Sequence, residues 1–83
     1  MSEQDILNKV REAFKAAFDV DGQSVSLETS PSDIPGWDSV GHLSLAMNLE
    51  QCFGINLDVD ELMEMENVRE IVRVITAKFS KKA

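Results

Sequence analysis

A serine and a histidine lie close together near the middle of the chain, after a long polar segment. Ser39 is expected in the first turn of a helix that Asp38 caps, because an aspartate there accepts a hydrogen bond from a backbone N–H group. A phosphate ester on the Ser39 hydroxyl would lie among unpaired N–H groups at the positive end of the helix dipole. The residues thus allow a phosphodiester at Ser39, although many helices simply begin with a serine.

Ser39 and His42 are also spaced to share one helix face, as a nucleophilic serine and its general base would be. The nucleophile elbow of hydrolases requires glycine two residues before the serine, however, and Trp37 occupies that position. The chain has one histidine and no evident oxyanion hole. We expect no hydrolase activity and interpret His42 as a surface residue that contacts a bound phosphate or a partner.

Acidic residues around an Asp-Gly turn partly match the calcium-binding loop of an EF-hand. Asp19, Asp21 and Glu28 fall at the third, fifth and twelfth positions of such a loop. Ala17 and Val25 occupy the first and ninth positions, where oxygen ligands are needed. A helix end followed by a solvated turn is the better interpretation, and no metal site is predicted.

The sulfur-containing side chains are interpreted mainly as residues that pack in the core. Cys52 is the single cysteine, has no basic neighbour in the sequence and is expected to be a small core residue. Met47, Met63 and Met65 either fill the core or form a pliable contact surface for varied partners, and both alternatives stay open.

Helices must position all these residues, since no strand pattern competes with the helical one. Asn67 with Glu70 resembles a capping box, and Gly54 is a typical helix-ending residue. The predicted fold is all-α, a four-helix bundle of one domain over residues 1–83, with three longer helices and a short third one. The expected helices span residues 3–18, 39–53, 59–65 and 68–79.

Residues 19–38 are expected to form a long loop, because they are polar and contain both prolines and two of the four glycines. Four apolar residues should anchor this loop to the bundle: Val25, Leu27, Ile34 and Trp37.

Two surface features of the predicted bundle are open to a functional interpretation. The helix over 39–53 carries more apolar residues than one buried stripe holds, so some must face solvent or a partner. The acids around the short helix form either a solvated face or a docking surface; they are Asp58, Asp60, Glu61, Glu64 and Glu66.

Charge is distributed unevenly along the 83 residues, whose formal net charge is −7. Eleven of the fifteen acids lie between Ala16 and Val68, a stretch without lysine or arginine. This field disfavours nucleic acids and anionic membranes and favours basic proteins, although acidity alone also aids solubility. With no membrane-spanning run, no signal-peptide pattern and one cysteine, a cytoplasmic monomer is expected.

Residues 37–43 (WDSVGHL) and 49–55 (LEQCFGI) resemble the acyl carrier proteins. The attachment motif of that family is Asp-Ser-Leu, followed downstream by a Leu-Glu-acid-x-Phe-Gly-Ile type of ending. Here the motif reads Asp38-Ser39-Val40. The resemblance extends over essentially the whole chain, including the helix layout.

The resemblance implies a covalent 4′-phosphopantetheine arm on Ser39, next to Asp38, and no catalysis by the chain itself. A phosphopantetheinyl transferase would attach the arm, whose thiol would carry acyl groups as thioesters. Acyl ligase, acyltransferase and ketosynthase-type enzymes with basic patches would be the partners. The positions implied to contact them are Val40, Leu43, Met47, Glu50, Asp60, Glu61 and Glu64.

Some residues depart from the pattern of fatty-acid-synthesis carriers. Val40 replaces the usual leucine, and Gly41, Ser44 and Gln51 stand where those carriers place acids. These departures favour a polyketide, peptide or specialised lipid pathway over housekeeping fatty-acid synthesis. Two alternatives remain: an aminoacyl or peptidyl carrier with the same arm, and an acidic helical interaction module without a cofactor.

Overall fold

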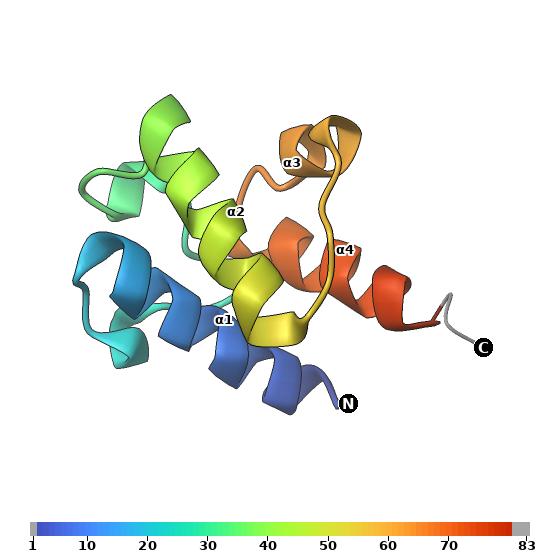
Figure 1. Ribbon diagram of the computed structural model, residues 1–83. Helices are drawn as coiled ribbons and strands as arrows, with labels where there is room; N and C mark the ends of the chain where they lie inside the picture. The colour runs from blue at the N-terminus through green and yellow to red at the C-terminus, as the bar shows by residue number, and fades with distance from the viewer. Residues whose placement is uncertain (1, 81–83) are drawn as a thin grey trace.

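Helices form all the regular secondary structure in the part of the chain that the structure describes, residues 2–80 (Figure 1). In this computed structural model the α-helices are α1 (Glu3–Phe18), α2 (Ser39–Phe53), α3 (Val59–Glu64) and α4 (Val68–Ser80). The predicted all-α bundle with a short third helix is confirmed. Helix α3 ends one residue earlier than predicted because Met65 leaves the helical conformation, and α4 extends one residue further. Residues 81–83 lie outside the described part.

Side chains at the helix starts satisfy backbone N–H groups that have no partner within the helix. The Ser2 hydroxyl accepts a hydrogen bond from the Asp5 N–H at 3.2 Å at the start of α1. At the start of α4, Asn67 Oδ1 accepts from the Glu70 N–H at 2.9 Å. The Glu70 carboxylate, however, binds Arg73 Nε at 2.6 Å instead of turning back to complete the predicted capping box.

The long segment 19–38 contains two short 3₁₀ helices, η1 (Gly22–Ser24) and η2 (Pro31–Asp33), which the sequence analysis treated as plain loop. The Asp21 carboxylate caps η1 through the Gln23 N–H at 3.0 Å. The predicted anchoring is confirmed: three apolar residues of the segment are buried and one is partly buried, namely Val25, Ile34 and Trp37, and Leu27.

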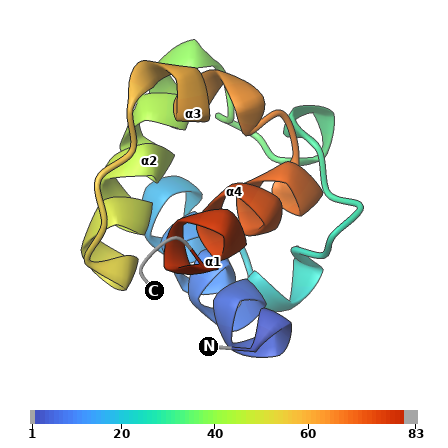
Figure 2. The same ribbon diagram turned by 90° about the vertical axis from the view of Figure 1, so that its right-hand side faces the viewer.

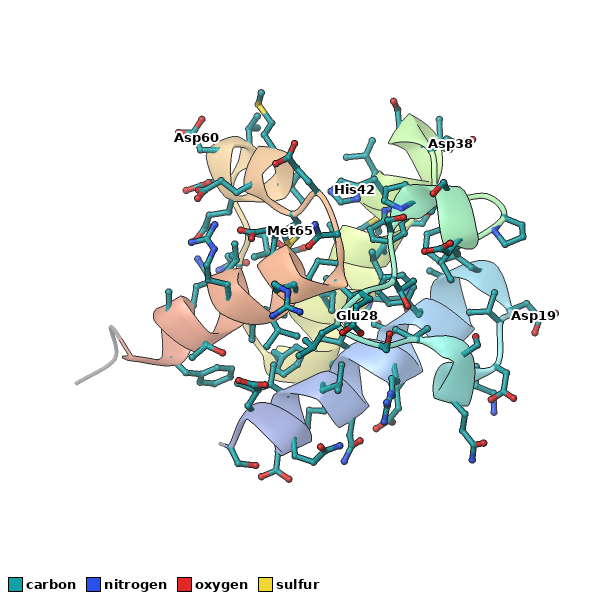
Figure 3. The ribbon with its side chains drawn as sticks, turned by 180° about the vertical axis from the view of Figure 1, so that it is seen from behind. Asp19, Glu28, Asp38, His42, Asp60 and Met65 are labelled. Carbon is teal, nitrogen blue, oxygen red and sulfur yellow. The ribbon has the colours of Figure 1, made fainter. Side chains whose placement is uncertain are left out.

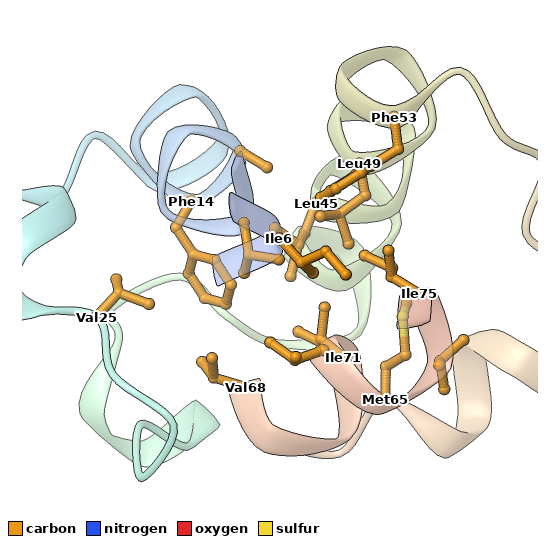
Figure 4. Close-up of a cluster of buried hydrophobic side chains, with 14 of the residues drawn as sticks. Ile6, Phe14, Val25, Leu45, Leu49, Phe53, Met65, Val68, Ile71 and Ile75 are labelled. Carbon is orange, nitrogen blue, oxygen red and sulfur yellow. The ribbon is translucent and has the colours of Figure 1, made fainter. Parts of the chain in front are cut away.

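The core lies between α1, α2 and α4, whose apolar side chains converge in the middle of the bundle (Figure 4). Phe14 from α1, Leu45 and Leu49 from α2, and Ile71 and Ile75 from α4 are fully buried. Each such side chain contributes about 1.5–3 kcal/mol on burial. These contacts hold the three long helices, whereas α3 adds only the partly buried Leu62 to the cluster.

Helix α3 lies on the side of the bundle away from α1, beside α2 and α4 (Figures 1 and 2). Lys78 Nζ on α4 donates to both carboxylate oxygens of Glu61 on α3, at 2.8 and 2.7 Å. Arg73 on α4 donates to Glu64 at 3.2 Å. Within residues 2–80, no helix is long and apolar enough to cross a membrane.

Candidate functional site

Ser39 is the first residue of α2 and its side chain is exposed. Asp38 precedes it as the N-cap residue, and its Oδ1 accepts a hydrogen bond from the Gly41 N–H at 2.9 Å. The N–H groups of Ser39 and Val40 occupy the first-turn positions that have no intrahelical carbonyl partner. The structure thus presents the Ser39 hydroxyl at the positive end of α2, as the sequence predicts.

A close backbone approach fixes the start of α2. A methyl group added at Gly41 would overlap the carbonyl oxygen of Gly36 and would lie 2.8 Å from the Phe18 ring. Gly36 itself has a φ of +89°, in the region that favours glycine. Gly41 therefore has a packing role, which explains why no acid stands at this position.

His42 is partly buried and hydrogen-bonded at both ring nitrogens, so its interpretation as a surface residue was wrong. The Trp37 indole Nε1–H donates to His42 Nδ1 at 2.8 Å. His42 Nε2 lies 2.9 Å from the carbonyl oxygen of Leu62 in α3. In Figure 3 the His42 side chain lies between the start of α2 and the segment that contains Met65.

These contacts leave His42 unsuited to act as a general base for Ser39. Its Nδ1 lone pair is occupied by the indole N–H, and its Nε2 faces a carbonyl oxygen and must carry the proton. A serine nucleophile needs a base with a free lone pair aimed at its hydroxyl. The geometry therefore provides no Ser-His dyad.

The residues weighed as calcium ligands have separate structural roles. Asp19 ends α1, Asp21 caps η1, and Glu28 forms a 3.9 Å ion pair with Arg69. Figure 3 shows Asp19 and Glu28 at different places on the molecule. Across residues 2–80 no group of three or more metal-binding side chains is assembled.

A groove of about 480 Å³ opens next to Ser39, which we call the Ser39 groove. It runs between the start of α2 and α3, and its volume lies within the range of small-molecule sites, about 300–1,000 Å³. The lining is mostly apolar and includes Trp37, Leu43, Val59, Leu62, Met63 and Met65. A flexible chain attached at Ser39 has an apolar surface within immediate reach.

Five large apolar side chains are exposed on α2 and α3, and we call them the apolar patch: Val40, Leu43, Met47, Val59 and Met63. The first three were predicted to contact partners and are 75%, 56% and 62% exposed. Val59 was not among the predicted contact residues, and for Met63 a contact surface was one of two open alternatives. The signal available for both was their four-residue spacing among acids on a short helix. Of the three methionines that were predicted either to fill the core or to form a contact surface, Met65 is buried in the core, whereas Met47 and Met63 are exposed.

The acids that the resemblance assigned to docking differ in their exposure and in the hydrogen bonds and ion pairs that they form within the fold. Asp60 is exposed and lies at the outer side of α3 (Figure 3). Glu50 accepts a hydrogen bond from the Leu57 N–H at 2.8 Å. Glu61 and Glu64 bind Lys78 and Arg73 of α4. The carboxylates of Glu70 and Glu64 raise the pKa of the Arg73 guanidinium through hydrogen bonds.

Cys52 is partly buried and packs against the core, in keeping with its prediction. A basic side chain does approach it from another helix, because Lys9 Nζ on α1 donates to the Cys52 carbonyl oxygen at 3.2 Å. The same ammonium lies 5.9 Å from the centroid of the Phe53 ring. Lys9 thereby connects α1 to the end of α2.

The chain matches known carriers in both sequence and structure. The family model described as "Phosphopantetheine attachment site" matches residues 8–75. The acyl carrier protein of Thermotoga maritima is 31% identical over 77 residues, which cover 93% of this chain and 95% of that protein. That of Petrotoga mobilis is 28% identical over 80 residues, covering 96% and 94%. A solution NMR structure of holo acyl carrier protein from Geobacter metallireducens superposes with a TM-score of 0.79 at 32% identity, covering 92% of this chain and 87% of that one.

An exposed serine at a helix start, next to an apolar groove in a small helical bundle, is an arrangement that suits a carrier protein. With the matches above, the chain belongs to the acyl carrier protein family. Its cofactor is phosphopantetheine, and it carries acyl groups for partner enzymes without catalysing a reaction itself.

Proposed function

We propose that Ser39 is the residue that bears the phosphopantetheine arm, and that the chain delivers acyl intermediates from this position to its partners. The observation that carries the proposal is the exposed Ser39 hydroxyl at the start of α2, on the rim of the Ser39 groove. The group fits the residues present. The unpaired N–H groups of the first turn favour a phosphodiester, and the Asp38 carboxylate is already bound to the Gly41 N–H.

Ser39 Oγ acts as the nucleophile in the attachment reaction. It forms a bond to the phosphorus of the phosphopantetheine half of coenzyme A while the bond to the adenosine bisphosphate half breaks. The hydroxyl proton passes to the transferase, because His42 has no free lone pair to accept it. Asp38 keeps the first turn of α2 in place through the Gly41 N–H. Once bound, the arm supplies a thiol that holds acyl groups as thioesters.

We further propose that partner enzymes contact the apolar patch, with Val40, Leu43 and Met47 at its centre. Supporting this, the three side chains are exposed on the helix that begins with Ser39. Asp60 is the acid best placed to meet a basic patch, since it is exposed. Glu50, Glu61 and Glu64 add negative charge while also holding the fold.

The partners proposed are a phosphopantetheinyl transferase and acyl ligase, acyltransferase or ketosynthase-type enzymes with basic surfaces. The net charge of −7 supports this choice, and the acids are concentrated around α2 and α3. A cytoplasmic monomer serving fatty-acid, polyketide or specialised lipid synthesis is the proposed context. The departures at Val40, Gly41 and Ser44 favour the latter two pathways, although Gly41 is also explained by packing.

Intact-mass measurement after incubation with coenzyme A and a broad-specificity transferase tests the assignment. The wild-type chain is expected to gain the mass of one phosphopantetheinyl group, and Ser39→Ala is expected to gain none. Ser44→Ala, which removes another exposed hydroxyl from α2, should load like wild type. Loading of Ser39→Ala, or no loading of the wild type, would contradict the proposal.

A further inference from the structure

His42 connects three parts of the fold that meet at the Ser39 groove. Through Nδ1 it binds Trp37, in the segment before α2, and through Nε2 it binds Leu62, in α3. Its own backbone belongs to α2, where its N–H donates to the Asp38 carbonyl oxygen at 2.7 Å. The imidazole is therefore a direct hydrogen-bonded link between α2 and α3.

The hydrogen bonds assign the tautomer of His42. An indole N–H can only donate, so His42 Nδ1 accepts and carries no proton. The proton is then on Nε2, which donates to the Leu62 carbonyl oxygen. That carbonyl lies in the last turn of a six-residue helix, where carbonyl groups lack N–H donors within the helix. Apart from His42, it accepts a hydrogen bond only from the Met65 N–H among the described residues, at 3.3 Å. Neutral His42 thus completes the C-terminal end of α3.

A second proton on His42 is incompatible with this arrangement. Protonation at Nδ1 would place two N–H donors against each other across the 2.8 Å between the imidazole and the indole. Trp37 cannot easily withdraw, because it is buried and packs edge-on against Phe14 with ring centroids 4.9 Å apart. The imidazole is the ring that must move, and it takes its Nε2–H away from Leu62.

Helix α3 can respond to this change without detaching from the bundle. On its other side it is held to α4 by the Glu61–Lys78 and Glu64–Arg73 ion pairs. Loss of the His42 contact therefore removes the hydrogen bond between α2 and α3, while these ion pairs and the packing of Leu62 against the core remain. The Ser39 groove lies between α2 and α3. The charged groups that share the groove with His42 are the carboxylates of Asp38 and Glu66.

We propose that His42 is a positioning residue: as the neutral Nε2–H tautomer it holds α3 against α2 and sets the shape of the Ser39 groove, and protonation at Nδ1 releases α3. The consequence for cargo binding rests on the proposed attachment at Ser39, whereas the positioning itself does not.

The test is NMR spectroscopy of the ¹⁵N-labelled full chain without the arm, so that its outcome is independent of whether Ser39 is modified. The chain has one histidine and one tryptophan, which makes both ring signals unambiguous. At neutral pH, long-range ¹H–¹⁵N correlations should show the Nε2–H tautomer. The Nδ1–H tautomer would overturn the proposal.

A pH series from about 8 to 5 then follows the indole N–H signal and the amide protection factors of α3 relative to those of α1. As His42 gains its second proton, the indole signal should shift, and α3 protection should fall about five- to tenfold, the loss expected for one hydrogen bond. Constant α3 protection through this titration would overturn the proposal.

Two variants separate positioning from a purely structural role and from titration of the nearby acids. His42→Gln does not titrate, and Trp37→Phe lets a protonated His42 keep its contact with Leu62. In both variants α3 should lose its pH response while α1 and α4 stay protected. A response that persists in both variants would come from carboxylates and would contradict the proposal. If one variant fails to fold, the other and the wild-type series still decide the result.

Discussion

At the scale of single residues, the hydrogen bonds already formed in the first turn of α2 decide which of its polar groups can still bind a ligand. Asp38 uses its carboxylate on the Gly41 N–H, so the N–H groups of Ser39 and Val40 remain for an anion. Ser39 is exposed, whereas His42 three residues later is bonded at both ring nitrogens. A hydroxyl that a separate enzyme can reach, with no base beside it, suits a residue that is modified and does not itself catalyse.

Gly41→Ala is expected to destabilise the fold although alanine is the better helix former. The added methyl group would overlap the Gly36 carbonyl oxygen and press on the Phe18 ring, at a cost of about 1–3 kcal/mol. Urea denaturation followed by circular dichroism measures the free energy of unfolding. Ser44→Ala on the exposed face of α2 is the control and should change this free energy by less than about 0.5 kcal/mol. Equal stability of the two variants would show that the start of α2 is not closely packed.

At the scale of elements, α3 differs from the three long helices in how it is held. It has six residues and none is fully buried, so it contributes little to the core. Besides the partly buried Leu62, which packs against the core, polar contacts fix it: Glu61 and Glu64 bind α4, and His42 binds the Leu62 carbonyl oxygen. On the proposal above, α3 is the helix whose position protonation of His42 would change.

Lys78→Met should loosen α3 while leaving the three-helix core intact. The Lys78–Glu61 pair is 24% and 20% exposed, so its loss leaves a partly buried carboxylate and should cost about 1–2 kcal/mol. Arg69→Met is the matched control, because the Arg69–Glu28 pair is 3.9 Å long and 60% and 80% exposed. It should cost less than about 0.5 kcal/mol. Chemical denaturation with amide exchange of α3 provides the measurement, and similar costs for both variants would refute the distinction.

At the scale of the whole molecule, acidic charge and exposed apolar side chains meet at α3, which carries Val59 and Met63 beside Asp60, Glu61 and Glu64. The acidic stretch between Ala16 and Val68 includes α2 and α3, which also carry the apolar patch. In the docking proposed above, long-range attraction would guide a basic partner, and short-range burial of apolar side chains would then stabilise the complex. The two contributions respond differently to salt, because screening weakens only the first.

The rate at which a transferase loads Ser39 is expected to fall several-fold as salt is raised from about 0.05 to 0.5 M. Asp60→Asn should reduce this salt dependence and lower the rate at low salt about twofold. Glu12→Gln makes the same change in charge at an exposed position of α1 and should load like wild type. Mass spectrometry of reactions quenched at successive times gives the loading rates. Equal rates for the two variants would exclude a steering role for Asp60.

The sequence by itself determined the helices and the place of the candidate attachment residue. Apolar spacing, the Asp38 cap and the glycine at 54 are local signals, and the helices that they predict agree with the structure to within one residue at each end. A local count also predicted that some apolar residues of α2 are exposed, since one buried stripe cannot hold them all. The resemblance to the carrier family, not the count, indicated Val40, Leu43 and Met47, which the structure shows to be exposed.

Only the tertiary structure decided the partners of polar side chains that bind a different helix. The contact of His42 with Leu62 spans 20 positions, that of Lys78 with Glu61 spans 17, and no spacing rule within one helix reports either. The same holds for Met65 and Met63, which differ in burial because the chain leaves α3 between them. Hydrogen bonding and burial depend on distances between elements, and these distances exist only once the helices have packed.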